Sequence, residues 1–347
     1  MKRARAIAFY LPQYHPVEAN DKFWGKGFTE WTNVTKAKPL YKGHKQPKLP
    51  SDLGLYDLRV PEVREQQVQL AKDAGIEAFC YWHYWFGKGE RVLERIFEEV
   101  VKNKKPDFPF CLGWANESWT GRWHGLDNEI IFEQTYPGEQ DYIDHFNSIL
   151  PALKDERYLT VNDQPVFLVY RPDNLPDKKQ FIDLWNDLAE QNNLKKFYFI
   201  AVSDNFEENR LFDKVLRGSL TIGIPRKKQT LFKKMNSNCP SDIFNYKDIV
   251  NIRLKTGYQE NEIPLVIPNW DNTPRSGKNG RIFDESTPEL YYQWLKESID
   301  HIKDRPIQER IVFIKSWNEW AEGNYLEPDR GYGSTYLEST KKAIYSK

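Results

Sequence analysis

The architecture of this chain can be inferred outward from one segment, Ile311-Val312-Phe313-Ile314-Lys315-Ser316 and the residues directly after it, Trp317-Asn318-Glu319-Trp320-Ala321-Glu322-Gly323. The first part is a short, mostly apolar run, which is typical of a parallel strand buried on both faces. The second part is aromatic and polar. In a parallel barrel, the loops that follow the strands gather at one end and carry the catalytic groups. The segment therefore predicts a barrel strand followed by a functional loop.

Similar apolar runs recur along the chain and predict the other strands: Ala4–Tyr10, Ile76–Tyr81, Phe110–Trp114, Pro165–Tyr170, Phe197–Val202, Pro264–Ile267 and a weaker one near Leu220–Ile224. Segments of helical period lie between most of them: Pro61–Asp73, Arg91–Val101, Gln140–Leu153, Lys179–Gln191, Pro288–Ile302 and Tyr336–Tyr345. Eight strands alternating with helices predict an α/β protein, a single (β/α)8 TIM barrel over residues 1–347 with long βα loops. A doubly wound sheet is the alternative. No glycine-rich phosphate-binding motif follows a predicted strand, which disfavours it.

The composition excludes several classes of protein. Lysine plus arginine number 50, and aspartate plus glutamate also number 50, so the chain lacks the basic excess of a nucleic-acid-binding protein. We find no apolar run long enough to cross a membrane and no signal peptide, and we expect a cytoplasmic protein. The three cysteines are far apart and indicate neither a disulfide framework nor a zinc ribbon. The oligomeric state stays open.

Aromatic residues are unusually frequent, with 12 Trp, 19 Tyr and 20 Phe. Trp185 and Trp294 lie on the apolar stripes of predicted helices, whereas the other ten tryptophans lie on segments that follow predicted strands. Aromatic faces stack on sugar rings, and Asp, Glu, Asn and His bind hydroxyl groups. The pattern predicts a glycan-binding site at the barrel mouth. The alternative is that the aromatic side chains only plug the mouth.

The candidate substrate-binding residues all lie on these segments: Tyr10, Tyr14, His15, Glu30, Trp31, Trp82, His83, Tyr84, Trp114, Asn116, Glu117, Trp119, Tyr170, Trp270, Asp271, Arg275, Trp317, Asn318 and Trp320. Trp123 and His124 lie there too. The histidines lack HxH or HxxxH spacing, so we expect no metal site, and we expect no cofactor. Arginines such as Arg275 could bind an anionic sugar or pair with barrel carboxylates, and the sequence does not separate these roles.

Glu319 and Glu322 are the candidate catalytic pair. They lie three residues apart just after the last strand, so a helical turn there would place both carboxyls on one side. Two carboxyls at a barrel mouth suit glycoside hydrolysis, and crowding raises the pKa of one of them. A surface ExxE segment is the alternative. Carboxyls that converge in the mouth would favour catalysis, whereas outward-facing or salt-bridged carboxyls would contradict it. Glu117 is a further candidate acid, although we favour a hydroxyl-binding role for it.

Seven segments together resemble the WbsX-type family: Phe9-Tyr10-Leu11-Pro12-Gln13-Tyr14-His15-Pro16, Gly27-Phe28-Thr29-Glu30-Trp31-Thr32-Asn33-Val34, Asp52-Leu53-Gly54-Leu55-Tyr56-Asp57, Phe79-Cys80-Tyr81-Trp82-His83-Tyr84-Trp85-Phe86, Trp114-Ala115-Asn116-Glu117, Trp270-Asp271-Asn272-Thr273-Pro274-Arg275 and Trp317-Asn318-Glu319-Trp320-Ala321-Glu322-Gly323. That family is commonly labelled a glycosyltransferase of lipopolysaccharide O-antigen and other surface-polysaccharide clusters. It is also described as similar to the family 99 glycoside hydrolases, which are (β/α)8 barrels.

The resemblance implies roles for the two glutamates. In family 99, which acts on α-mannosides with retention, a similar Asn-Glu-Trp-x-Glu segment carries the catalytic pair. Glu322 would then be the general acid/base. Glu319 would be the base that helps the sugar's 2-hydroxyl attack through a 1,2-anhydro intermediate. The identity of the substrate does not transfer.

The two family labels imply different enzymes. A nucleotide-sugar transferase usually carries a DxD metal motif or a glycine-rich helix start, and the sequence has neither. We therefore favour a glycoside hydrolase that acts on a bacterial surface polysaccharide or its precursor, and we keep a glycosyltransferase as the alternative. A non-catalytic glycan-binding barrel is the third hypothesis.

Overall fold

The structure is a computed structural model that describes residues 2–120, 130–219, 221–227 and 238–345. In these residues, eight parallel strands follow one another around a barrel in the order β11-β13-β1-β2-β3-β7-β8-β9. Their bounds are β1 (Arg5–Tyr10), β2 (Ile76–His83), β3 (Phe110–Trp114), β7 (Gln164–Val169), β8 (Tyr198–Val202), β9 (Lys214–Leu216), β11 (Leu265–Val266) and β13 (Ile311–Ile314). The predicted (β/α)8 barrel is confirmed.

The barrel closes between its first and last strands through a short parallel bridge. Val215 in β9 pairs with Glu262, just before β11. The Val215 N–H donates to the Asn261 carbonyl at 3.0 Å, and the Ile263 N–H donates to the Val215 carbonyl at 2.9 Å. Because only this bridge joins the two strands among the described residues, the seam is narrower than the other strand pairings.

The sixth strand was predicted in the wrong place. The structure has it at Lys214–Leu216, whereas residues 221–224 form no strand and residue 220 lies outside the described residues. This strand has only three residues, of which Val215 and Leu216 are buried. A run this short, next to charged residues on both sides, lacks the hydrophobic pattern on which a prediction depends.

Helices surround the barrel: α3 (Pro61–Asp73), α4 (Glu94–Asn103), α5 (Glu139–Leu153), α6 (Lys178–Gln191), α8 (Tyr246–Thr256), α10 (Pro288–His301) and α11 (Thr335–Tyr345). The sequence analysis did not predict α8. The six predicted helices agree with the structure to within about one residue, apart from α4, which ends two residues later and begins three residues later than predicted. There Arg91 forms a bridge with Trp85 and Leu93 is left-handed (φ 62°), so the helix begins at Glu94. None of the described helices is both long and apolar enough to cross a membrane.

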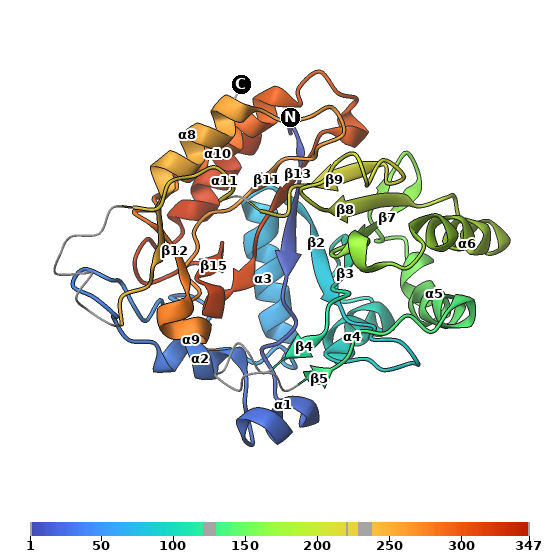
Figure 1. Ribbon diagram of the computed structural model, residues 1–347, viewed down its shortest axis with the longest axis horizontal. Coiled ribbons are helices and arrows are strands. Elements are labelled where there is room, and N and C mark those ends of the chain that lie inside the picture. Colours follow the sequence, from blue (N-terminus) through green and yellow to red (C-terminus); the bar gives the residue numbers. More distant parts are fainter. Residues whose placement is uncertain (1, 121–129, 220, 228–237, 346–347) are drawn as a thin grey trace.

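Additional short elements cover the carboxyl ends of the strands. These are α1 (Glu18–Trp24), α2 (Glu30–Lys36), α9 (Thr273–Ser276), β4 (Trp119–Thr120), β5 (Ile130–Phe132), β10 (Asp242–Asn245), β12 (Arg281–Asp284), β14 (Asn318–Glu319) and β15 (Asn324–Tyr325). The short strand β6 (Thr160–Val161) instead pairs with the beginning of β7, at the amino end of the barrel. Figure 1 shows α1, α2, α9 and the β4–β5 hairpin gathered at the end toward which the β1 arrow points. Segments distant in sequence therefore build one end of the barrel.

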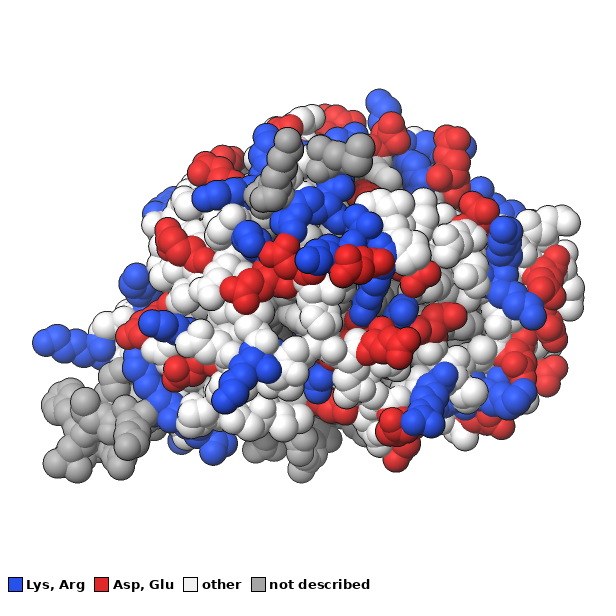
Figure 2. Space-filling view, turned by 90° about the horizontal axis from the view of Figure 1, so that it is seen from above, with Lys and Arg blue, Asp and Glu red and all other residues white. Residues whose placement is uncertain are grey.

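Charged side chains of both signs are mixed on the face of the molecule that Figure 2 shows. On the face seen in Figure 2, lysine and arginine alternate with aspartate and glutamate over most of the area. This agrees with equal numbers of basic and acidic residues in the sequence. The face shown has no broad surface of one sign that would attract a polyanion.

Candidate active site

A pocket of about 490 Å³ lies at the carboxyl end of the strands. Its described lining combines four carboxylates, two cations and several aromatic side chains: Leu11, Gln13, Trp24, Glu30, Trp82, Tyr84, Ala115, Glu117, Ser118, Trp119, Thr120, Ile131, Tyr170, Asn174, Arg275, Lys315, Glu319 and Glu322. We call it the active-site pocket. It is large enough for part of a small ligand to be enclosed.

Both candidate catalytic glutamates line this pocket. Glu319 belongs to β14, and Glu322 ends the 3-10 turn Trp320–Glu322 that follows it. Hydrogen bonds fix this turn from behind. The Asn318 side chain binds both the N–H (2.8 Å) and the carbonyl (3.0 Å) of Leu11, and the Tyr14 hydroxyl donates to the Asn318 carbonyl at 2.6 Å. The segment is thereby tied to the loop after β1.

Glu319 is buried in a way that favours its neutral form. Burial, followed by the nearby charge of Glu322, raises the pKa of Glu319 to about 7, while Lys315 and Arg275 oppose the shift. Its Oε2 atom is buried and has no hydrogen-bond partner among the described residues. A carboxyl that can gain or lose a proton near neutral pH, with an oxygen left free in a pocket, is suited to acid–base chemistry.

Glu322 has a different environment because Arg275 binds it. The Arg275 guanidinium donates from one nitrogen to Glu322 at 2.8 Å and from another to Glu30 at 3.1 Å. These three side chains are mostly buried and all line the pocket. Glu322 thus meets the expectation of convergence, but it is also salt-bridged, which we had taken as evidence against catalysis. The ion pair lies inside the pocket, so it holds the carboxylate there instead of drawing it outward.

Arg275 reaches the pair because the loop after β11 directly contacts the turn that carries Glu319 and Glu322. The Asp271 N–H donates to the Glu322 carbonyl at 2.8 Å. Gly323, which follows Glu322, is left-handed (φ 54°), and a Cβ there would lie 2.8 Å from the Asp271 carbonyl oxygen. Only glycine combines that conformation with so close an approach.

Aromatic side chains form one wall of the pocket. The Trp82 ring stacks on Phe9 with 4.7 Å between centroids and meets Tyr170 nearly at a right angle, at 5.4 Å. Tyr84 and Trp119 make an edge-to-face pair at 5.1 Å. Because these rings support one another, their orientation is set before a ligand arrives.

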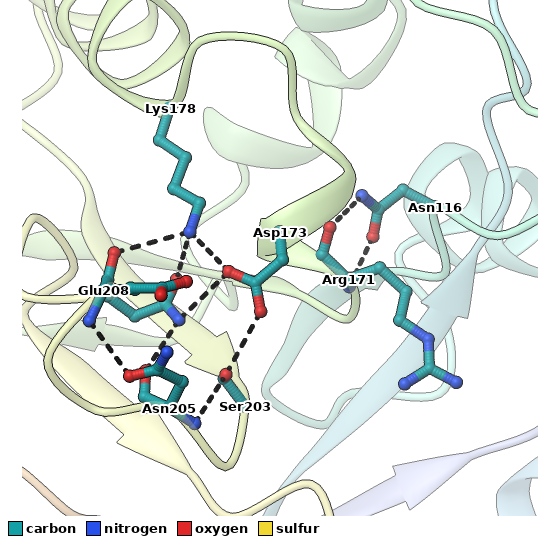
Figure 3. A network of polar contacts seen from close by, with 8 residues as sticks. Asn116, Arg171, Asp173, Lys178, Ser203, Asn205 and Glu208 are labelled. Carbon is teal, nitrogen blue, oxygen red and sulfur yellow. Dashed lines mark hydrogen bonds and ion pairs between the residues drawn. The ribbon is translucent and has the colours of Figure 1, made fainter.

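At the rim, the Asn116-Glu117 pair has divided roles. The Asn116 amide donates to the Arg171 carbonyl at 2.8 Å and accepts from the Arg171 N–H at 2.7 Å, so it is fully buried and structural. Figure 3 shows this clamp, with the Arg171 guanidinium turned away from the network around Asp173. That guanidinium binds Glu117 at 3.1 Å instead. Glu117 lines the pocket from this exposed position.

The structure corrects the prediction that ten tryptophans face the mouth. Five of them are buried in the protein core: Trp31, Trp85, Trp114, Trp317 and Trp320. Trp114, for example, donates to the Trp85 carbonyl at 2.9 Å and packs against helix side chains. Trp24, Trp82 and Trp119 line the pocket, Trp270 lies next to it, and Trp123 and His124 are outside the described residues. The prediction failed because successive residues of a strand face opposite sides, and the sequence of the loop that follows does not show which of its side chains face the pocket.

Further predicted binding residues serve as supports. Tyr10, Tyr14, His15, His83, Asp271 and Asn318 are all buried outside the pocket lining. His83 lies with its Nε2 at 2.8 Å from that of His145, and burial lowers the pKa of His83 to about 3. Asp271 accepts hydrogen bonds from His44 and Gln46, both at 2.8 Å. None of these six side chains is placed to touch a ligand in the pocket.

Sequence reasoning missed several lining residues, above all Lys315. This lysine directly follows the last residue of β13 and lines the pocket beside Glu319. A lysine within a run of buried, apolar strand residues is unusual, and that departure from the pattern was the available indication. Gln13, Ser118 and Asn174 were missed as well.

The sequence comparisons identify the family. The profile described as glycosyltransferase WbsX matches residues 6–340. The chain belongs to this WbsX family. Two uncharacterized WxcX proteins of Xanthomonas campestris pv. campestris, from strains B100 and ATCC 33913, are each 36% identical over 349 residues, which is 98% of this chain but 50% of theirs. The WbsX chain thus spans about half the length of these curated relatives.

Solved structures share the barrel of this WbsX protein. A glycoside hydrolase-like protein superposes with a TM-score of 0.63 at 14% identity, covering 99% of this chain and 94% of its own. The family 99 endo-α-mannosidase of Bacteroides thetaiotaomicron superposes with a TM-score of 0.59 at 17% identity, covering 98% and 96%. At these identities the likeness establishes the fold.

Proposed function

We propose that this WbsX protein is a retaining glycoside hydrolase that acts on a bacterial surface polysaccharide or its precursor, with Glu319 and Glu322 as the catalytic pair. The observation that carries the proposal is the meeting of these two carboxyls, from one turn, in a pocket with an aromatic wall. The charge of Glu322 acts on Glu319, so the two groups are close enough to be coupled. Paired carboxyls of this kind are the equipment for cleaving a glycosidic bond.

The chemistry follows from what each group can do. One carboxyl must donate a proton to the departing glycosidic oxygen, and the other must act as a base on the attacking side. Arg275 can orient Glu322 and stabilise negative charge there, while Trp82 and Tyr84 hold the sugar ring. The family 99 enzyme named above is an endo-α-mannosidase, and we propose that the bond cleaved here is an α-glycosidic bond too.

Glycosyl transfer is the second candidate, and the family description favours it. If a sugar hydroxyl replaces water in the second step, the same two carboxyls transfer a glycosyl unit. A transferase that uses a nucleotide sugar would instead bind that donor. Thermal-shift measurements with nucleotide sugars and a divalent metal distinguish the two: a clear stabilisation supports the transferase, and a flat response counts against it. A barrel that only binds glycans would show binding without turnover in either assay.

Replacing either catalytic glutamate tests the proposal. We expect Glu319→Gln and Glu322→Gln each to reduce turnover by a factor of about 10³ or more while glycan binding stays largely intact, because glutamine keeps the shape but cannot exchange a proton. The measurement is a hydrolysis screen on α-glycosides and bacterial polysaccharides, with binding followed by calorimetry. Glu98→Gln on the exposed face of α4 is the control. Full activity in both pair variants would exclude this site.

The roles of the two carboxyls can be separated with substrates that need no acid. If Glu322 is the general acid/base, as the family resemblance implies, Glu322→Gln keeps activity on aryl glycosides with good leaving groups, whereas Glu319→Gln does not. The reversed assignment, with Glu319 as the acid, is also testable, because Glu319 is the carboxyl with the raised pKa in the structure without a ligand. If only Glu319→Gln keeps that activity, the acid is the carboxyl whose pKa burial raises to about 7.

A further inference from the structure

A second pocket of about 160 Å³ adjoins the active-site pocket. Trp82, Tyr170 and Lys315 line both, so these side chains form a shared boundary. The rest of its described lining comes from the ends of β8, β9, β11 and β12: Val202, Leu216, Arg217, Gly218, Ser219, Thr221, Leu265, Ile267, Trp270, Arg281 and Phe283, with Phe9 from β1. It has about a third of the volume of the active-site pocket, which suits one sugar unit or a substituent.

Lys315 is the cation at this boundary, and its charge is not neutralised by contact. Its ammonium lies 4.9 Å from the centre of the Trp270 ring, which holds it by a cation–π interaction. Among the described residues, no carboxylate lies within ion-pair distance of it and no hydrogen bond to it is formed. Burial disfavours the charge of this half-buried ammonium, but the nearby Tyr170, Glu319 and Glu322 outweigh burial and raise the pKa of Lys315. The ammonium therefore stays charged, with three N–H donors available to a ligand.

The other polar side chains of the second pocket are also mainly donors. Its described lining includes Arg217, Arg281 and Lys315 but no aspartate or glutamate. The Arg281 Nε and the Trp270 Nε1 are both buried without a hydrogen-bond partner. A hydroxyl group of a neutral sugar both donates and accepts, whereas a carboxylate only accepts. A carboxylate therefore matches this donor-rich wall better than a neutral sugar does.

The carboxylates behind the arginines do not cancel this charge completely. Two nitrogens of the Arg217 guanidinium donate to the Glu262 carboxylate, at 2.9 and 3.1 Å. Asp242, by contrast, is shared between Arg226 at 2.7 Å and Arg281 at 3.4 Å. Asp242 therefore lies closer to Arg226 than to Arg281, so the Arg281 guanidinium is only weakly paired and can still receive a carboxylate from a ligand.

We propose that the second pocket is a subsite for an acidic sugar, and that Lys315, with Arg281, binds the carboxylate of a uronic acid next to the bond held at Glu319 and Glu322. This inference rests on the proposed function, because it names the class of substrate for the same site.

The test compares acidic oligosaccharides with their neutral counterparts. Trimers of glucuronate, galacturonate and mannuronate, and the same trimers with their carboxyls reduced, are titrated calorimetrically into the wild-type protein and into Lys315→Met. We expect at least one acidic trimer to bind the wild type about tenfold or more tightly than its reduced form. Lys315→Met should lose that preference while its affinity for the reduced trimer stays the same. Lys315→Arg should keep most of the preference for the acidic trimer, because it keeps the positive charge.

Controls make the outcomes decisive. Lys303→Met, an exposed lysine after α10, should leave every affinity unchanged, and thermal unfolding of Lys315→Met reports whether it folds. The inference is overturned if the wild type prefers no acidic trimer over its reduced form. It is also overturned if Lys315→Met shows the same preference as the wild type. If mannose 6-phosphate binds and no acidic trimer does, the pocket is a phosphate site instead. If neutral glycans are cleaved without an acidic preference, the proposed function stands and this inference fails. If an acidic trimer binds through Lys315 and no glycan is ever cleaved, this inference stands and the proposed function fails.

Discussion

At the scale of single residues, two glutamates of the same turn experience opposite surroundings. Glu319 is buried with a free carboxyl oxygen, whereas Glu322 is bound by Arg275. The spacing of the two in the sequence predicted that they would act together. It did not reveal the arginine, which lies 47 positions earlier in the chain. The difference between the two carboxyls therefore comes from tertiary contacts.

The raised pKa of Glu319 predicts how stability depends on pH. Folding raises this pKa from 4.5 to about 7, so between these values the native state binds more protons than the unfolded state. The contribution of Glu319 to stability therefore falls as the pH rises from about 5 to about 8, by up to about 3 kcal/mol. Glutamine cannot lose a proton, so Glu319→Gln should lessen this decline in urea unfolding. Glu117→Gln, at the exposed rim, should follow the wild type.

At the scale of elements, the turn that carries Glu319 and Glu322 depends on its contact with the loop between β11 and α9. Tryptophans in these loops illustrate the limit of pattern analysis. Trp317 and Trp320 lie beside the pair in sequence but point into the core, and the indole N–H of Trp320 donates to the buried Glu327 at 2.6 Å. A short loop has no repeating period, so its sequence does not distinguish side chains that face the pocket from those that anchor the loop.

The close approach at Gly323 gives a prediction at this scale. A methyl group there would lie 2.8 Å from the Asp271 carbonyl and 2.9 Å from the Asp271 nitrogen, in addition to the strain of a positive φ. We expect Gly323→Ala to lower the free energy of unfolding by about 2–4 kcal/mol and to reduce turnover, because the turn must move. Gly333→Ala is the matched control, with φ 56° and open space around its Cβ position. Equal effects in both variants would mean that φ strain alone matters.

At the scale of the whole molecule, the barrel is continuous except for the narrow seam between β9 and β11. The longer apolar runs, such as β2 and β7, were predicted because an apolar run of that length seldom occurs by chance. The three-residue β9 was not, although it completes the barrel. Its position is set by pairing with its neighbours, which is a property of the closed sheet and not of its own residues.

The seam provides a test of barrel closure. Glu262 pairs with Val215 across the seam and its buried carboxylate holds Arg217. Removing it in Glu262→Ala leaves the half-buried Arg217 guanidinium without its partner, so we expect a loss of about 1–3 kcal/mol in unfolding free energy. The exposed Glu260→Ala should change stability little. Urea unfolding measures both, and unchanged stability in Glu262→Ala would show that the seam does not need this ion pair.

The sequence by itself determined the alternation of strands and helices, the barrel class, the family and the pairing of Glu319 with Glu322, because these depend on local periodicity and short spacings. Tertiary structure alone decided which aromatic residues face the pocket, that Arg275 binds Glu322, and that Lys315 stands unpaired between two pockets. These are contacts between residues that are distant along the chain. Their energies depend on burial and on neighbouring charges, neither of which exists until the barrel has closed.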